Sequence, residues 1–91
     1  MRKAQPVPST GAQSVLLALK ANGVDYLFAN AGTDFPPIIE ALASLDPDFL
    51  PQAVTVPHET ASMAMAHGYY LVTGQAQAVM VHVNVGLANA V

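Results

Sequence analysis

The residues that could carry chemistry fall in three short stretches of this 91-residue sequence. The stretches are residues 30–34, 57–60 and 82–89, and each follows an apolar run of strand-like composition. Elsewhere the chain offers mainly apolar side chains for packing. The carboxyl ends of parallel strands meet at one edge of a sheet, and α/β proteins bind their ligands there. The pattern therefore predicts one ligand site at the strand ends, built from all three stretches.

Glu59 is the most informative of these residues. It stands in the first turn of a predicted helix, where the helix dipole favours an anion, and the simplest interpretation is that it only complements this helix end. The flanking sequence is short of Lys and Arg, however, so a buried Glu59 would have an unusual environment. Desolvation favours the protonated form of a carboxyl group. Such a group is well suited to sharing its proton with a ring nitrogen of a bound heterocycle.

The three histidines are weaker candidates. His82 ends an apolar strand before a glycine-containing turn, so it is either an acid–base group or a packed residue at the edge of the core. His58 precedes Glu59 and could contact the same ligand, whereas His67 lies deep in the predicted helix as a packing or surface residue. His58 and His67 do not share a helix face, and no acidic residue has ligand spacing. We therefore expect no metal site in this chain.

Two glycines follow predicted strands. Gly32 and Gly86 each mark a sharp turn or a close approach of a ligand to the backbone. Neither turn has the GxGxxG pattern or the pattern of a phosphate-binding loop. The sequence thus argues against a nicotinamide or nucleoside-triphosphate site.

The elements that must position these residues alternate between helices and strands. Helices are expected over residues 10–22, 36–45 and 58–72, strands over residues 24–29, 52–56 and 77–83, and a further helix after a turn at residues 84–89. Thr10 and Gln13 have the spacing of a capping box, while Gly23 and Gly74 suit helix ends. Such alternation predicts an α/β fold, in which helices flank a parallel sheet with right-handed crossovers. Three strands correspond to an incomplete doubly wound domain.

Apolar spacing predicts which helix faces are buried. In the first helix, Ala12, Val15, Leu16 and Leu19 keep the spacing of one face. In the third helix, Ala61, Ala64, Met65 and Gly68 form a stripe of mostly small side chains. This stripe is expected to lie close against the sheet or another helix.

Composition limits the class of protein. Apolar residue types make up 53% of the chain and charged types 10%, against roughly 25% charged in an ordinary domain. So few charged residues cannot cover the surface of an isolated monomer. We therefore expect that much of this surface is buried against other protein, or that the chain is part of a larger one. This apolar content excludes intrinsic disorder. The absence of cysteine excludes a disulfide scaffold and a thiol nucleophile.

Charge and hydropathy limit the kinds of partner and the cellular location that we expect for this chain. A net charge of -3 with three basic residues argues against nucleic-acid binding. No apolar run approaches the ~18 residues of a membrane span. Residues 1–10 form a polar, proline-containing arm without a secretory apolar stretch, which favours a cytoplasmic location.

Three ordered segments resemble the superfamily of thiamine-diphosphate-dependent decarboxylases and acetolactate synthases. Residues 22–36 (NGVDYLFANAGTDFP) resemble its opening strand and turn, residues 57–69 (PHETASMAMAHGY) its HE-x-x-A…A-x-GYA helix, and residues 81–90 (VHVNVGLANA) a following turn that is usually Gly-Pro-Gly-x-x-Asn. The match runs from about Gly11 to the last residue. The resemblance implies that residues 1–91 are the N-terminal part of a pyrimidine-binding domain, with residues 1–10 as a loose arm.

The resemblance also implies roles for individual residues. The family's glutamate, at the position of Glu59, hydrogen-bonds the aminopyrimidine ring of thiamine diphosphate and so promotes deprotonation of the thiazolium ring. The thiazolium carbon then attacks a 2-keto acid, which leads to decarboxylation or carboligation. Within the superfamily the third motif is most similar to benzoylformate decarboxylases, in which a histidine at the position of His82 is an acid–base group. The remaining assignments are Asn30, Thr33 and His58 on the substrate side and Gly32 and Asn89 on the cofactor side, with Asn89 in a structural role.

Further partners follow from the same resemblance. The family binds Mg²⁺ and the diphosphate through a Gly-Asp-Gly…Asn motif of a later region, which this sequence lacks. The chain alone is therefore expected to be inactive, as a fragment or as one subunit of a split enzyme, in a homodimer or homotetramer. Two alternatives stay open: a non-catalytic α/β interaction module, and a nucleotide-binding oxidoreductase fragment, which the missing glycine fingerprint disfavours.

Overall fold

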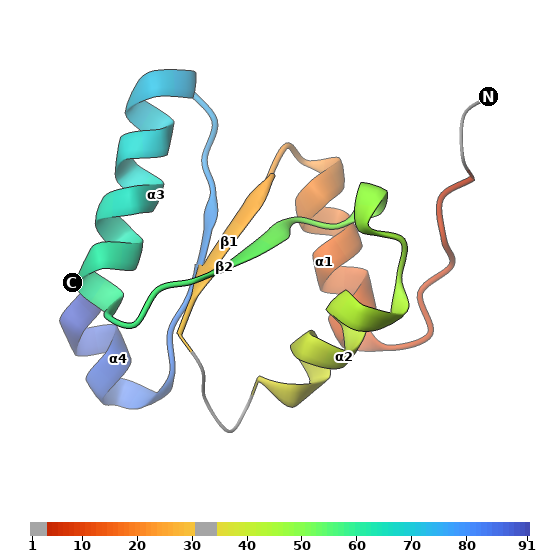
Figure 1. Cartoon of the computed structure of the whole chain (residues 1–91), viewed down its shortest axis with the longest axis horizontal. Helices are drawn as coiled ribbons and strands as arrows, with labels where there is room; N and C mark the ends of the chain where they lie inside the picture. The colour runs from red at the N-terminus through yellow and green to blue at the C-terminus, as the bar shows by residue number, and fades with distance from the viewer. Residues whose placement is uncertain (1–3, 31–34) are drawn as a thin grey trace.

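The computed structural model describes residues 4–30 and 35–91 (Figure 1). Along the chain the elements are α1 (Gly11–Ala21), β1 (Tyr26–Ala29), α2 (Pro36–Ser44), the single 3₁₀ turn η1 (Pro47–Phe49), β2 (Gln52–Thr55), α3 (Glu59–Thr73), β3 (Ala78–Met80) and α4 (Val83–Ala90). The predicted alternation of helices and strands is confirmed. The predicted turn at residues 84–89 is wrong, because α4 already begins at Val83.

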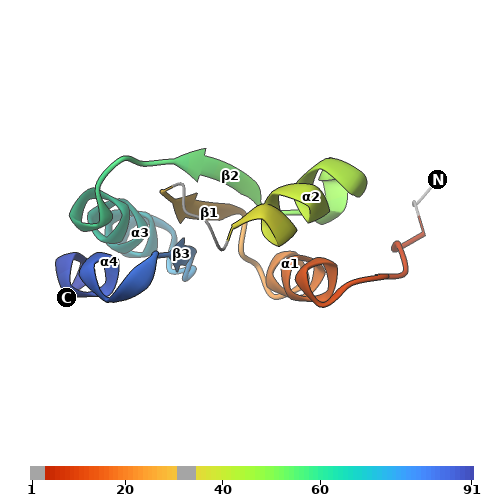
Figure 2. The ribbon, with the colours of Figure 1, turned by 90° about the horizontal axis from the view of Figure 1, so that it is seen from below.

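The three strands form one parallel sheet in the order β2-β1-β3. Helices α1 and α2 lie on one face of this sheet and α3 and α4 on the other (Figure 2). Successive side chains of a strand point to opposite faces. Accordingly, Leu27 of β1 joins the core beneath α1 and α2, whereas the ring of Tyr26 meets Tyr69 of α3 with 5.5 Å between centroids.

The layer of α1 and α2 encloses the hydrophobic core. Its buried members are Leu16, Leu17, Leu27, Ala41 and Leu50. The predicted face of the first helix is correct at Leu16 but wrong at Val15, which is 54% exposed. The buried positions of α1 are Gln13, Leu16 and Leu17, at the i, i+3, i+4 spacing of one helix face. Val15 lies off that face because each helical residue turns the chain by about 100°.

The ends of the helices follow the predicted signals. Thr10 caps α1 by accepting a hydrogen bond from the backbone N–H of Gln13 at 3.2 Å. The side chain of Gln13 reaches back one residue further than a capping box requires and accepts from the backbone N–H of Ser9 at 2.7 Å. Gly23 and Gly74 follow α1 and α3 with φ of 91° and 74°, values that glycine adopts without steric cost.

Helix α3 turns a different face to the sheet from the predicted one. Ala61, Ala64 and Met65 of the small-residue stripe are exposed. Ser62, at 2% exposure, is buried instead, and Tyr69 lies seven residues further along the same face, against β1. The serine is small enough, and the tyrosine ring flat enough, to pack against the sheet, although neither belongs to an apolar pattern.

Among the helices of residues 4–30 and 35–91, none has the length and apolar character of a membrane span.

Candidate functional site

The residues that follow the three strands come together at one edge of the sheet, as predicted. Asn30, directly after β1, donates from Nδ2 to the carbonyl oxygen of Pro57, after β2, at 3.1 Å. Thr60 of α3 donates from Oγ1 to the carbonyl oxygen of Asn89 in α4 at 2.8 Å. Two hydrogen bonds thus connect the three strand ends. Of the predicted site residues, Gly32 and Thr33 lie outside the described residues.

Glu59 lies at the centre of this edge. It is the first residue of α3, after His58 as the N-cap, whose Nδ1 accepts from the backbone N–H of Thr60 at 3.2 Å. The half-buried carboxylate of Glu59 faces α4. Its Oε1 accepts a hydrogen bond from Nδ2 of Asn89 at 3.4 Å, and its Oε2 lies 3.2 Å from the point where a Cβ on Gly86 would stand.

Hydrogen bonds hold the pKa of the Glu59 carboxyl below its usual value. The largest contribution comes from its own backbone N–H and the next from the Asn89 side chain; partial burial opposes them, and Asn30 and His58 add smaller lowering effects. The condition for proton uptake, a desolvated carboxylate, is not met in this chain, where Glu59 is half-buried and its pKa is lowered. The hydrogen bonds lower the pKa more than partial burial raises it, so the carboxylate is ionised at neutral pH.

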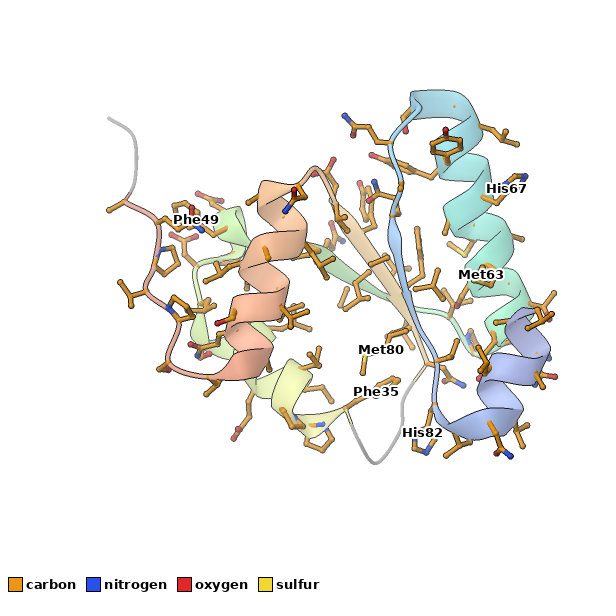
Figure 3. All side chains as sticks on the ribbon, turned by 180° about the vertical axis from the view of Figure 1, so that it is seen from behind. Phe35, Phe49, Met63, His67, Met80 and His82 are labelled. Carbon is orange, nitrogen blue, oxygen red and sulfur yellow. The ribbon has the colours of Figure 1, made fainter. Side chains whose placement is uncertain are left out.

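His82 occupies the N-cap position of α4, directly after the end of β3. Its ring packs in a T-shaped arrangement with the buried Phe35 at the start of α2, with 6.0 Å between centroids and 81° between planes. Figure 3 shows both side chains beyond Met80, at the edge of the sheet where β3 ends. Phe35, which belongs to the layer of α1 and α2, thus fixes His82 at the same edge of the sheet as Glu59.

His58 and His67 differ in position. His58 is exposed at the site edge, where its ring serves as the cap of α3. His67 is exposed on α3 and points away from the sheet (Figure 3). Of the two interpretations of His67, packing or surface residue, the surface one is therefore correct. The described residues contain no group of three or more His, Asp or Glu side chains that could hold a metal ion.

Three features of the site escaped sequence reasoning. Val83 adopts φ of 55°, a left-handed conformation that strains a β-branched residue. Thr60 connects α3 to α4, and Phe35 supports His82. No local pattern marks Thr60 or Phe35, because their partners lie far away in the sequence. No sequence signal marks the positive φ of Val83 either, since it is a β-branched residue.

A hollow lies at the opposite ends of the strands, away from Glu59. It has a volume of about 760 Å³, and its lining includes Lys20, Asp25, Asp48 and Tyr69. Lys20 Nζ and Asp25 Oδ1 form an ion pair at 2.8 Å. Burial and the charge of Asp25 raise the pKa of Tyr69. The ion pair joins the end of α1 to the residue that precedes β1.

One family model matches the sequence. Residues 9–91 match the model described as thiamine pyrophosphate enzyme, N-terminal TPP binding domain. The match covers all three strand ends of the site. No curated protein matches the chain.

Proposed function

We propose a function from the premise that this chain belongs to the thiamine pyrophosphate enzymes, in which it represents the N-terminal cofactor-binding domain. In this proposal the chain presents the Glu59 carboxylate to the aminopyrimidine ring of thiamine diphosphate. The enzyme acts on a 2-keto acid by decarboxylation or carboligation. Mg²⁺ and the diphosphate bind to a region outside these residues, and the enzyme is a homodimer or homotetramer.

The observation that carries the proposal is the placement of an ionised carboxylate at the carboxyl ends of the strands. Glu59 Oε2 lies against the space that Gly86 leaves open, so the carboxylate has a defined position before any ligand arrives. Thiamine diphosphate, when bound, would supply a thiazolium ring whose deprotonated carbon is a nucleophile and whose positive charge takes up the electron pair released from the substrate. The Glu59 carboxylate would hold the aminopyrimidine ring by accepting a hydrogen bond from one of its nitrogen atoms. Hydrogen bonds to a charged group contribute about 1.5–3 kcal/mol.

His82 is proposed as the acid–base or orienting group for the substrate oxygen, as in the benzoylformate decarboxylases. Its half-buried place after β3 and its contact with Phe35 support a fixed orientation. Asn30, Thr33 and His58 are proposed on the substrate side, and Gly32 and Asn89 on the cofactor side. Replacement of His82 by Ala should slow turnover more than it weakens cofactor binding.

The proposal is tested by titrating thiamine diphosphate and Mg²⁺ into the assembled enzyme, with this chain isotope-labelled, and recording amide chemical shifts. We expect the largest shifts at Glu59, Gly86 and Asn89. Glu59→Gln should weaken binding about tenfold or more, because it removes the charge from the hydrogen bond. The matched control is Glu40→Gln, which makes the same chemical change on the exposed surface of α2 and should leave binding unchanged. Equal affinity of wild type and Glu59→Gln would contradict the proposal.

One observation favours a second candidate function, a non-catalytic interaction module. Large apolar side chains are exposed on α3 and α4, namely Met63, Met65, Leu71, Val72, Val85 and Leu87. Exposed apolar patches of this kind mark surfaces that contact other protein. Assembly of the chain without any amide shift at Glu59 on addition of thiamine diphosphate would favour this function.

A further inference from the structure

We infer that Gly86 and Asn89 are positioning residues for the Glu59 carboxylate. Gly86 leaves the space beside one carboxylate oxygen, and Asn89 donates a hydrogen bond to the other. This inference deepens the proposed function, because it assumes that Glu59 is the group that meets the cofactor. It concerns the geometry of Glu59 itself, however, so it can be tested without any cofactor.

The glycine at position 86 has no backbone explanation. Gly86 lies inside α4, and its backbone N–H donates to the carbonyl oxygen of His82 at 3.2 Å, as in a regular helix. Among the described glycines only Gly23 and Gly74 have positive φ. Alanine is favoured over glycine within a helix. A different constraint must therefore account for glycine here.

The space around Gly86 supplies that constraint. A Cβ at this position would stand 3.2 Å from Oε2 and 3.6 Å from Cδ of Glu59, and 3.5 Å from Cβ of Val81. The contact with Val81 is an ordinary packing distance, whereas the contact with Oε2 is unusually tight and would make the carboxylate shift by a few tenths of an ångström. Gly68, inside α3, has nothing within 4 Å of its corresponding point. Among the described glycines, Gly86 is thus the one at which an added methyl group would meet the Glu59 side chain.

Asn89, in the next turn of α4, contacts the other oxygen of the Glu59 carboxylate. It lies three residues after Gly86 and therefore on the same helix face. Its Nδ2 donates to Oε1 of Glu59 at 3.4 Å, and its carbonyl oxygen accepts from Thr60 Oγ1 at 2.8 Å. The second hydrogen bond ties α4 to the first turn of α3. The first is long, so it orients the carboxylate while leaving it available to a stronger donor.

Together the two residues orient the carboxylate before a ligand binds. Asn89 binds one carboxylate oxygen and Gly86 leaves room for the other, and the helix that carries them is fixed to α3 at Thr60. A side chain that is already held in its bound orientation loses less conformational entropy on binding. Gly86 and Asn89 should thus affect ligand binding through the orientation of the Glu59 carboxylate.

The test compares wild type, Gly86→Ala, Asn89→Ala and the control Gly68→Ala. In each, the Glu59 carboxyl carbon is followed by NMR as pH is varied, and urea unfolding is measured. Asn89→Ala should raise the pKa of Glu59 towards its usual value, and Gly86→Ala should shift the carboxyl resonance and its titration. Gly86→Ala should keep the unfolding midpoint of wild type, since alanine suits a helix, yet weaken thiamine diphosphate binding about tenfold. Gly68→Ala should change neither the titration nor the binding.

Titration of Glu59 that is unchanged in both Gly86→Ala and Asn89→Ala would overturn the inference, whatever the cofactor does. If both variants alter the titration while wild type gives no response to thiamine diphosphate, the inference stands and the proposed function fails. If Gly86→Ala lowers the unfolding midpoint, the double variant Gly86→Ala/Glu59→Asp is measured. The side chain of aspartate is shorter than that of glutamate and would not reach the new methyl group. Recovery of the midpoint would support the contact, and lack of recovery would overturn it.

Discussion

The two helical layers differ in what they bury and in what they expose. Beneath α1 and α2, Leu16, Leu17 and Ala41 are almost fully buried. On α3 the only buried residue is a serine, Ser62, and on α4 a glycine, Gly86. The layer of α1 and α2 thus provides the hydrophobic core, whereas the layer of α3 and α4 leaves much of its apolar surface open.

The layer with the weaker core carries most of the candidate site. Glu59, Gly86 and Asn89 belong to α3 and α4, and His82 caps α4. The other layer contributes Phe35 as a support for His82. Stability and chemistry are therefore separated in this chain. The exposed apolar surface of α3 and α4 also supports the proposal that other protein covers this layer in the assembled enzyme.

The largest expected effect is the loss of a core side chain beneath α1. Leu16→Ala should reduce the free energy of unfolding by about 2–5 kcal/mol, since Leu16 is 1% exposed and its removal leaves a cavity. Leu87→Ala removes the same atoms from α4, where Leu87 is 58% exposed, and should cost less than about 0.5 kcal/mol. Urea unfolding measures both. Similar losses in the two variants would show that the layers do not differ in this way.

A smaller effect is expected from the strained residue at the start of α4. Val83→Gly should raise the free energy of unfolding by about 1 kcal/mol, because glycine adopts a φ of 55° without strain. Val85→Gly, two residues later in the same helix, should lower it by about 0.5 kcal/mol. Thermal unfolding of the two variants gives the comparison. A loss of stability in Val83→Gly would mean that the side chain of Val83, rather than its backbone conformation, matters for packing.

The smallest effect concerns pH. The pKa of Glu59 is lowered in the folded chain from its usual value of 4.5, so Glu59 stabilises the fold above that value and loses this contribution as pH falls through the lowered pKa. Glu59→Gln should therefore reduce the acid sensitivity of the unfolding midpoint. Glu40→Gln, on the exposed face of α2, should have no such effect. Equal acid profiles for wild type and Glu59→Gln would contradict the hydrogen-bonded arrangement of the carboxylate.

The sequence predicts the parts of the fold that depend on local signals. The cap at Thr10, the glycine ends at Gly23 and Gly74 and the order of helices and strands are all set by neighbouring residues. The convergence of the three strand ends follows from parallel topology. Local chemistry and a general rule of topology are thus sufficient to predict these features from the sequence.

Features that depend on distant partners could not be predicted. Helical spacing assigns Val15 and the small-residue stripe of α3 to buried faces, yet it does not show which of two adjacent faces meets the sheet. The lowering of the Glu59 pKa comes first from its own backbone N–H and next from Asn89, which lies thirty residues away in the sequence. The sequence pattern places Gly86 in a turn, whereas the structure places it inside α4. Its proximity to Glu59 exists only in the folded chain and so leaves no local signal.

The central claim is that the Glu59 carboxylate activates a bound thiamine diphosphate. It is tested most directly by the rate at which the thiazolium C2 proton of the cofactor exchanges with deuterated water in the assembled enzyme. Glu59→Gln should slow this exchange about 100-fold or more, while Glu40→Gln leaves it unchanged. Exchange at the wild-type rate in Glu59→Gln would contradict the account.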